Sequence, residues 1–204
     1  MASLSRRTDA QTARRAAVEA RVLEAAERLL AEGTAYAGLS VDRIATEAGI
    51  SRPAFYFYFR DKRELLMRLT EDVADRLYAQ AESWWTAEQA DGPTALAEAL
   101  AAVVGLYRSH GVLLRAVVEA STYDEPIAVF WRAVIARFAD ATRARIEAEQ
   151  AAGRAAGLDA AGTASALAWM TERTVYEHMV QELGDDDALV RSLVGIWVRT
   201  VYAG

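Results

Sequence analysis

Hydrophobic residues recur along most of the chain every three or four positions, the spacing that places them on one face of an α-helix. In the first such segment, residues 16–32, Val18, Val22 and Leu29 share this face, and Gly33 follows as a typical helix stop. The sequence has no alternating run of Val, Ile and Thr and no Asn-Gly turn, so nothing in it favours a sheet. The pattern therefore predicts an all-α protein.

Capping residues and helix breaks divide this pattern into about nine helices. The three prolines, Pro53, Pro93 and Pro126, each fall near a predicted helix start, where proline is tolerated. After the helix at 16–32, the predicted helices lie at residues 40–49, 51–59, 61–90, 94–109, 112–122, 126–152, 159–184 and 186–202. The short helices come before residue 60 and the longer ones after it, which indicates two modules.

Charge is distributed unevenly between these modules. The chain has a net charge of −6, but residues 1–63 contain 11 Arg and Lys against 8 Asp and Glu. A basic N-terminal module followed by an acidic C-terminal module is typical of a protein in which one module contacts a polyanion. We therefore expect three parts: a flexible basic arm at 1–15, a basic module at 16–63 and an acidic module at 64–204. The arm is rich in Ser, Thr, Gln and Ala and carries Arg6, Arg7, Arg14 and Arg15.

Two short predicted helices separated by a glycine-containing turn describe a helix-turn-helix, which places its second helix in the major groove of DNA. Ser40 and Ser51 are natural N-caps for the two helices, and Gly49 ends the first. Apolar residues must fix the angle between the helices, and Ala45, Ile50, Phe55 and Phe59 are the candidates.

Five consecutive aromatic residues, 55–59, lie on the second of these helices. A helix turns by about 100° per residue, so they cannot all face one core. Phe55 and Phe59, four apart, are expected to point inward, and the direction of Phe57 is left open. The alternative is an over-packed core segment, which the polar groups around the run disfavour. We expect DNA contacts from Ser40, Ser51, Arg52, Ala54, Tyr56, Phe57, Tyr58 and Lys62.

Each of these side chains suits a particular contact. The hydroxyls of Tyr56 and Tyr58 and the charge of Lys62 suit phosphate, and Arg52 suits a guanine edge or a phosphate. Ser40 would place its hydroxyl and the backbone N–H groups of a helix start on a phosphate. The arginines of the arm either extend the contact along a groove or form a solvated tail.

The segments 39–45, 48–59 and 62–66 together resemble the DNA-binding signature of TetR-family transcriptional regulators. Within that family, the chain is similar to the EthR-type repressors almost throughout. The similar segments include Ser109-His110, Phe130-Trp131, Met170 to Thr174, Ile196 to Val198, Tyr202 and Gly204. The resemblance implies a homodimer that pairs through the last two helices. It also implies a mostly apolar tunnel among the middle helices, which binds lipophilic ligands and thereby releases operator DNA.

The resemblance also implies which residues bind the ligand. These are Leu96, Leu100, Val103, Tyr107, Trp131, Ile135, Phe138, Thr142, Met170, Thr171, Tyr176 and Trp197. Ala168 and Thr171 replace two tunnel asparagines of the EthR-type pattern, and Leu96 and Phe138 stand at two of its aromatic positions. We therefore expect a more apolar pocket, with Tyr107, Thr142 and Thr171 as its polar groups. Glu172 and Arg173 could pair with charges on other helices, and we expect such structural ion pairs in preference to the alternative, ligand binding.

Other classes of protein find little support. The chain has no cysteine and only two histidines, His110 and His178, which leaves little for disulfides, metal sites or catalytic triads. Glu172 and His178 are six residues apart and would face different sides of a helix, and the acidic run 185–187 fits a solvated helix start. We expect neither an enzyme nor a bound metal or cofactor.

Membrane attachment is not expected either. No apolar run approaches the roughly 18–20 residues of a membrane span, and the basic N-terminus is not followed by an apolar segment, so the predicted location is the cytoplasm. The remaining alternative is a helix-turn-helix regulator without small-molecule control. A cavity among the middle helices would favour ligand control, and a solid core would favour the alternative.

Overall fold

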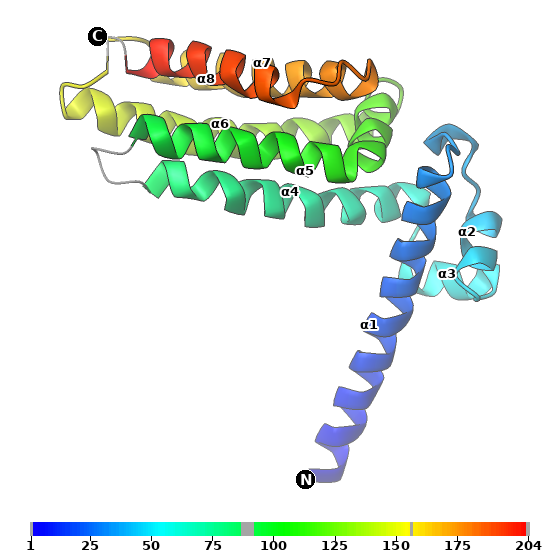
Figure 1. The fold of residues 1–204 in the computed structure, drawn as a ribbon. Coiled ribbons are helices and arrows are strands. Elements are labelled where there is room, and N and C mark those ends of the chain that lie inside the picture. The colour runs from blue at the N-terminus through cyan, green and yellow to red at the C-terminus, as the bar shows by residue number, and fades with distance from the viewer. Residues whose placement is uncertain (1, 87–91, 156, 203–204) are drawn as a thin grey trace. The chain divides into compact units, whose positions relative to one another are not determined.

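The computed structural model describes residues 2–86, 92–155 and 157–202, with side chains from Thr12 onward. Every regular element in these ranges is a helix, which confirms the all-α prediction (Figure 1). The elements are α1 (Ala2–Ala31), η1 (Tyr36–Gly38), α2 (Val41–Glu47), α3 (Arg52–Tyr58), α4 (Lys62–Thr86), α5 (Gly92–Ser121), α6 (Glu125–Ala151), α7 (Ala160–Val180) and α8 (Asp186–Val201). The chain folds as two compact units, Met1–Thr70 and Glu71–Gly204, so α4 belongs to both.

Helix α1 is longer than the sequence pattern predicted. It begins at Ala2 rather than near residue 16, so most of the segment expected to be a flexible arm continues the helix. Residues 2–32 contain neither glycine nor proline and are rich in Ala and Arg, which favour helix. Gly33, with a φ of 87°, then ends α1 as predicted, and the N–H of Thr34 donates to the carbonyl of Leu29 at 3.2 Å. The side chains of Arg6 and Arg7 lie outside the described residues.

The first unit is held together by apolar faces of α1, α2, α3 and the start of α4. Phe55 and Phe59 are 0% and 1% exposed, and their ring centroids lie 5.5 Å apart. These two rings therefore anchor α3 in the core, as the sequence predicted. The core also contains Val22, Ala25, Ala26, Leu29, Leu30, Ile44, Ala45, Leu65, Leu66 and Leu69.

The second unit is a bundle in which α5 contacts α6, α7 and α8, and α6 packs along α7 (Figure 1). The sequence predicted two helices at 94–109 and 112–122. The structure has one helix with a kink at His110, whose φ and ψ are −118° and 19°. This is why the described residues contain eight α-helices instead of about nine.

Helix α5 is also long and apolar enough, by length and composition alone, to cross a membrane. Such a segment was not expected from the sequence, because the apolar residues of α5 do not form an unbroken run. In the structure, Leu96, Leu100, Val104, Leu114 and Val117 of α5 are buried. We therefore interpret α5 as the core helix of the second unit.

The anchoring of α3 can be tested with Phe55→Ala. Removing a fully buried ring leaves a cavity, so the substitution should lower the free energy of unfolding by about 3–5 kcal/mol. Urea denaturation followed by circular dichroism measures this change. Phe57→Ala is the matched control: its ring is 71% exposed, and we expect a change within about 0.5 kcal/mol. Similar losses from both variants would contradict the assignment of Phe55 to the core.

Candidate nucleic-acid interface and apolar pocket

The turn between α2 and α3 is built by local hydrogen bonds. The hydroxyl of Ser40 accepts from the backbone N–H of Arg43 at 3.2 Å, and that of Ser51 accepts from the N–H of Ala54 at 3.3 Å. Both serines are thus the N-caps that the sequence predicted. Between the helices, Gly49 adopts a φ of 66°, a backbone conformation that suits glycine. The result is a helix-turn-helix with both cap hydroxyls on exposed residues.

Arg52 is held in place on the exposed side of α3. Its Nη1 lies 2.9 Å from Oδ2 of Asp42 on α2, and its guanidinium carbon lies 6.0 Å from the ring centroid of Tyr56. Tyr56 and Asp42 both raise the pKa of the Arg52 guanidinium, which is charged at neutral pH in any case. The charge of Arg52 therefore sits at a defined position at the start of α3.

The other side chains of α3 differ in how far they are exposed to solvent. Tyr56 and Phe57 are 47% and 71% exposed, whereas Ala54 and Tyr58 are half-buried. This resolves the direction of Phe57, which the sequence left open: the ring faces solvent. The guanidinium carbon of Arg15, on α1, lies 5.9 Å from the centroid of that ring. One exposed surface therefore combines aromatic rings with arginines.

The ammonium group of Lys62 is held by contacts within the protein. Its Nζ donates to the backbone carbonyls of Tyr36, Ala37 and Leu39, at 3.1, 3.1 and 3.0 Å. An ammonium group has three donor positions, and these three carbonyls match that number. The contacts tie the start of α4 to η1, so Lys62 braces this part of the first unit.

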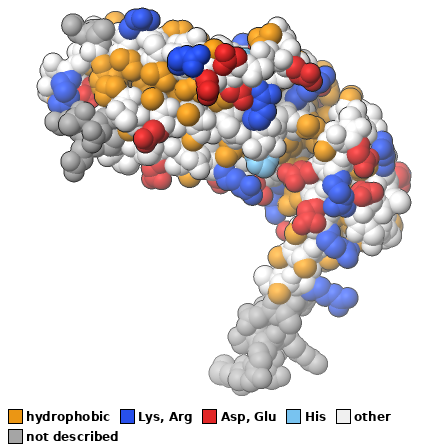
Figure 2. Space-filling view, in the orientation of Figure 1, with side chains coloured by type: hydrophobic (Ala, Val, Ile, Leu, Met, Phe, Trp, Pro, Cys, Tyr) orange, Lys and Arg blue, Asp and Glu red, His pale blue; other side chains and the backbone are white. Residues whose placement is uncertain are grey.

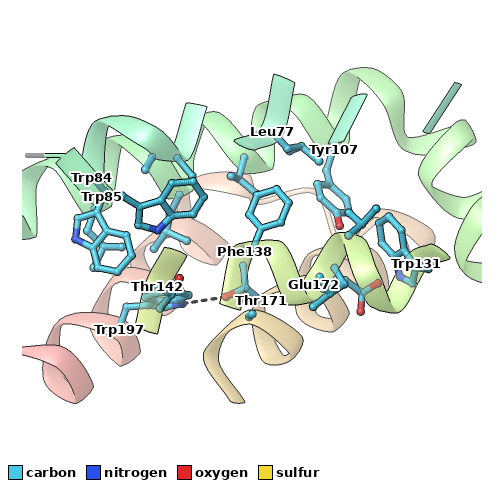
Figure 3. A pocket seen from close by; sticks show the side chains of 18 residues that line it. Leu77, Trp84, Trp85, Tyr107, Trp131, Phe138, Thr142, Thr171, Glu172 and Trp197 are labelled. Carbon is cyan, nitrogen blue, oxygen red and sulfur yellow. Dashed lines mark hydrogen bonds between the residues drawn. The ribbon is translucent and has the colours of Figure 1, made fainter. Parts of the chain in front are cut away.

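The second unit contains an apolar cavity of about 90 Å³ among α4, α5, α6, α7 and α8 (Figure 3). It is lined by Leu77, Ala81, Trp84, Trp85, Leu96, Ala99, Leu100, Val103, Tyr107, Trp131, Val134, Ile135, Phe138, Thr142, Ala168, Thr171, Glu172 and Trp197. Aromatic rings from four helices dominate this lining, so the cavity favours hydrophobic molecules.

Hydrogen bonds hold several rings of the pocket in position. The indole N–H of Trp197 donates to the hydroxyl of Thr171 at 2.9 Å, and that of Trp84 donates to the hydroxyl of Tyr202 at 2.9 Å. The rings of Trp84 and Trp197 meet edge to face, with centroids 5.4 Å apart. Helix α4 is thereby joined to α8 at one end of the pocket.

Glu172 is the one carboxyl group among the described residues that line this pocket. The residue is 4% exposed, and within the described part of the chain neither of its carboxylate oxygens has a hydrogen-bond partner. Burial raises its pKa. Arg173 and the indole N–H of Trp131 partly offset this rise, although that N–H lies outside hydrogen-bonding geometry. Burial also raises the pKa of the Tyr107 phenol, and the nearby charge of Glu172 adds to this rise.

Comparisons with known proteins give the same division into two parts. Residues 22–69 match the family described as bacterial regulatory proteins, tetR family. Residues 96–203 match the C-terminal domain of the transcriptional regulator EthR. The HTH-type transcriptional regulator EthR of Mycolicibacterium smegmatis is 32% identical over 187 residues, which cover 90% of this chain and 86% of the relative. EthR of Mycobacterium tuberculosis is 32% identical over 191 residues, which cover 90% and 87%.

The chain belongs to the TetR family of transcriptional regulators, with an EthR-type C-terminal domain. Solved structures share its fold. A putative TetR-family regulator from Syntrophomonas wolfei superposes with a TM-score of 0.76 at 16% identity, covering 89% of this chain and 93% of that one. FadR from Bacillus subtilis, solved in complex with stearoyl-CoA, gives 0.72 at 19% identity, covering 89% and 98%.

Most residues predicted for the ligand site of this EthR-type regulator line the cavity. These are Leu96, Leu100, Val103, Tyr107, Trp131, Ile135, Phe138, Thr142, Thr171 and Trp197. Met170 and Tyr176 do not line it: both are half-buried, and the ring of Tyr176 lies 5.0 Å from the guanidinium of Arg173. The hydroxyl of Thr171, expected to be available to a ligand, already accepts from Trp197.

The predicted ligand site did not contain the lining residues from α4. Leu77, Ala81, Trp84 and Trp85 follow one another at intervals of four, three and one, which places them on one helix face. That spacing was the signal that could have found them. The other lining residues missed by the prediction are Ala99, Val134 and Glu172, whereas Ala168, expected at a tunnel position of the EthR-type pattern, lines the cavity.

The acidic run at the start of α8 has a structural role. Asp185 caps the helix by accepting from the N–H of Ala188 at 2.8 Å. Asp186 pairs with Arg108 of α5 and lies 3.0 Å from Nε2 of His178 on α7. These contacts join three helices, and they agree with the interpretation of this run as a helix start.

The raised pKa of Glu172 predicts a pH-dependent gain in stability for Glu172→Gln. The folded-state pKa lies above its ordinary value of 4.5, so folding opposes ionisation. This cost is absent below the unfolded-state pKa, grows as the pH rises from there to the folded-state pKa, and is constant above it. The variant should therefore be more stable than the wild type at pH 8, by about 1–3 kcal/mol, and by less at pH 5.

Denaturant unfolding of both proteins at the two pH values measures this difference. Glu177→Gln, one turn and a half along the same helix, is the control, because its side chain is 44% exposed and its removal should change stability little at either pH. A pH-independent difference between the wild type and Glu172→Gln would contradict the burial of a charge at this position.

Proposed function

We propose that this TetR-family regulator acts as a dimeric repressor that a lipophilic small molecule releases from its operator. The observation that carries the proposal is the apolar cavity whose wall includes α4, the helix that begins in the helix-turn-helix unit. A ligand in the cavity and DNA at α3 would both act on the same continuous helix. The two events would therefore be coupled through α4.

The surface of α3 supports binding in the major groove. Ser51, Arg52, Tyr56 and Phe57 are exposed on it, and the hydroxyl of Ser40 is exposed at the start of α2. Arg52 is placed to reach a guanine edge or a phosphate, and Tyr56 to donate its hydroxyl to a phosphate. The exposed ring of Phe57 suits apolar contact with a thymine methyl group or a sugar.

A helix as short as α3 buries little surface, so tight binding requires two copies on half-sites about one helical turn of DNA apart, or a multiple of that spacing. We expect dimerisation through α7 and α8. Trp169, Val180 and Ile196 on these helices are 38%, 36% and 43% exposed, and Leu183 between them is 60% exposed. Figure 2 shows hydrophobic side chains gathered on the surface of this unit. An apolar surface of this kind is typical of a protein interface.

The size of the cavity suggests how release occurs. At about 90 Å³ it is smaller than the several hundred Å³ of typical ligand pockets. A lipophilic effector must therefore push its walls apart, including Leu77, Trp84 and Trp85 of α4. The effector favours release only if it binds the expanded state better than the DNA-binding state. The FadR structure with stearoyl-CoA illustrates a chain of this fold with such a ligand bound.

The alternative is a helix-turn-helix regulator without small-molecule control. A solid bundle core would favour it, and the aromatic-lined cavity disfavours it. The relatives are named transcriptional regulators, so the family offers no support for catalysis.

Arg52→Ala should weaken binding to operator fragments selected from host genomic DNA by about 5- to 100-fold, since one base or phosphate contact by arginine is lost. Its ion pair with Asp42 is exposed on both sides, so the melting temperature should stay nearly constant. Gel-shift titration and thermal denaturation measure the two effects. Arg132→Ala, an exposed arginine on α6, should leave operator binding unchanged. Unchanged binding by Arg52→Ala would refute its role.

Filling the cavity should separate effector response from DNA binding. Ala99 is 4% exposed and lines the pocket, so Ala99→Leu should occupy part of the space that a ligand needs. With 1-decanol as a neutral lipophilic probe, we expect release of operator DNA to require at least fivefold more ligand, while operator affinity without ligand stays the same. Ala101→Leu, on the exposed side of α5, is the control. An equal response from both variants would count against the cavity as the effector site.

A further inference from the structure

The carboxyl group of Glu172 is buried in the wall of the otherwise apolar pocket. Its side chain is 2% exposed, and it lies at the same end of the pocket as Tyr107 and Trp131 (Figure 3). The guanidinium of Arg173 lies just within the distance of an ion pair, with Nε 3.9 Å from Oε2 of Glu172. Arg173 itself is 53% exposed and also lies 3.6 Å from Glu177. The charge of Glu172 is therefore poorly compensated by the protein.

The groups around this carboxyl come from three helices. Helix α5 contributes the phenol of Tyr107, α6 contributes the indole of Trp131, and α7 contributes Arg173 and the carboxylate of Glu177. Every other described lining residue is apolar, aromatic or a threonine. A buried carboxylate without partners is costly, and a ligand that brings a positive charge would remove that cost.

We propose that the effector of this regulator is a cationic amphiphile, whose basic nitrogen pairs with Glu172 while its hydrophobic body lies among the aromatic rings of the pocket. The inference rests on the proposed function and adds the chemical class of the ligand.

Two further features favour a cation over an anion or a neutral molecule. The aromatic rings of Trp131 and Tyr107 lie at the same end of the pocket as the carboxyl, and aromatic rings attract cations. Residues 64–204, the acidic module, carry 21 Asp and Glu against 12 Arg and Lys, so this part of the chain attracts cations over a distance. A fatty carboxylate would instead place a second negative charge beside Glu172, and an alcohol would supply one hydrogen bond but no charge.

Three probes with the same ten-carbon chain test the proposal: 1-decylamine, 1-decanol and decanoate. The amine is protonated between pH 5 and pH 8, as a lysine side chain is. Binding to the full-length protein is measured by isothermal titration calorimetry below the concentration at which the probes form micelles. We expect the wild type to bind decylamine at least tenfold more tightly than decanol and to bind decanoate most weakly. Its affinity for decylamine should rise from pH 5 to pH 8 as Glu172 loses its proton.

The variant Glu172→Gln keeps the shape of the side chain and removes its charge. It should lose at least tenfold in affinity for decylamine, lose the pH dependence, and bind decanol within about threefold of the wild type. Glu177→Gln, which changes an exposed carboxyl on the same helix, should keep the preference for the amine. Unaltered decanol binding also shows that the pocket of Glu172→Gln remains folded.

The outcomes separate this inference from the proposed function. In one outcome, decanol binds and releases operator DNA, but decylamine binds no more tightly than decanol. In another, Glu172→Gln binds decylamine as tightly as the wild type does. Either result shows that the cationic ligand class is wrong, while the proposal of a lipophilic effector stands. If none of the three probes binds, both proposals fail. A preference for decanoate would also overturn the cationic class, because it would show that Glu172 does not act as a negative charge toward the ligand.

Discussion

Helix α3 has only seven residues, and a helix of that length does not hold its shape in water by itself. Its geometry depends on the burial of Phe55 and Phe59 and on the cap at Ser51. The exposed side chains of α3 are therefore placed by the core of the first unit and not by the helix alone. Control of DNA binding then requires moving that unit as a whole, or loosening its core, because α3 cannot respond independently.

Helix α4 is the element through which such control can act. It starts at Lys62, whose ammonium group is fixed on three carbonyls around η1, and it ends with Trp84 and Trp85 in the wall of the pocket. Its far end is tied to α8 through Trp84, Trp197 and the hydroxyl of Tyr202. Both ends are thus anchored by specific polar contacts. A ligand that enlarges the small cavity by displacing α4 works against these attachments.

Local rules explain which features the sequence could predict. The caps at Ser40 and Ser51 and the turn at Gly49 depend on neighbours within a few residues, and the structure has all three. The partners of Lys62 are more than twenty residues away in sequence, so its position on backbone carbonyls could not be inferred. The kink at His110 is a local distortion within a continuous helix, and the pattern showed it only as a break between two helices.

The environment of Glu172 is a further feature that the sequence could not predict. From the sequence we expected ion pairs between Glu172 or Arg173 and charges on other helices, whereas both ion pairs of Arg173 lie within α7. Successive residues on a helix point about 100° apart. Arg173 consequently faces solvent while Glu172 faces the cavity, and the two meet only at 3.9 Å. The free protein bears the cost of a buried, poorly compensated carboxylate. A cationic ligand that pairs with Glu172 removes this free-energy cost, but only in the conformation whose pocket admits the ligand. Such a difference between two states is what a ligand needs in order to shift their balance.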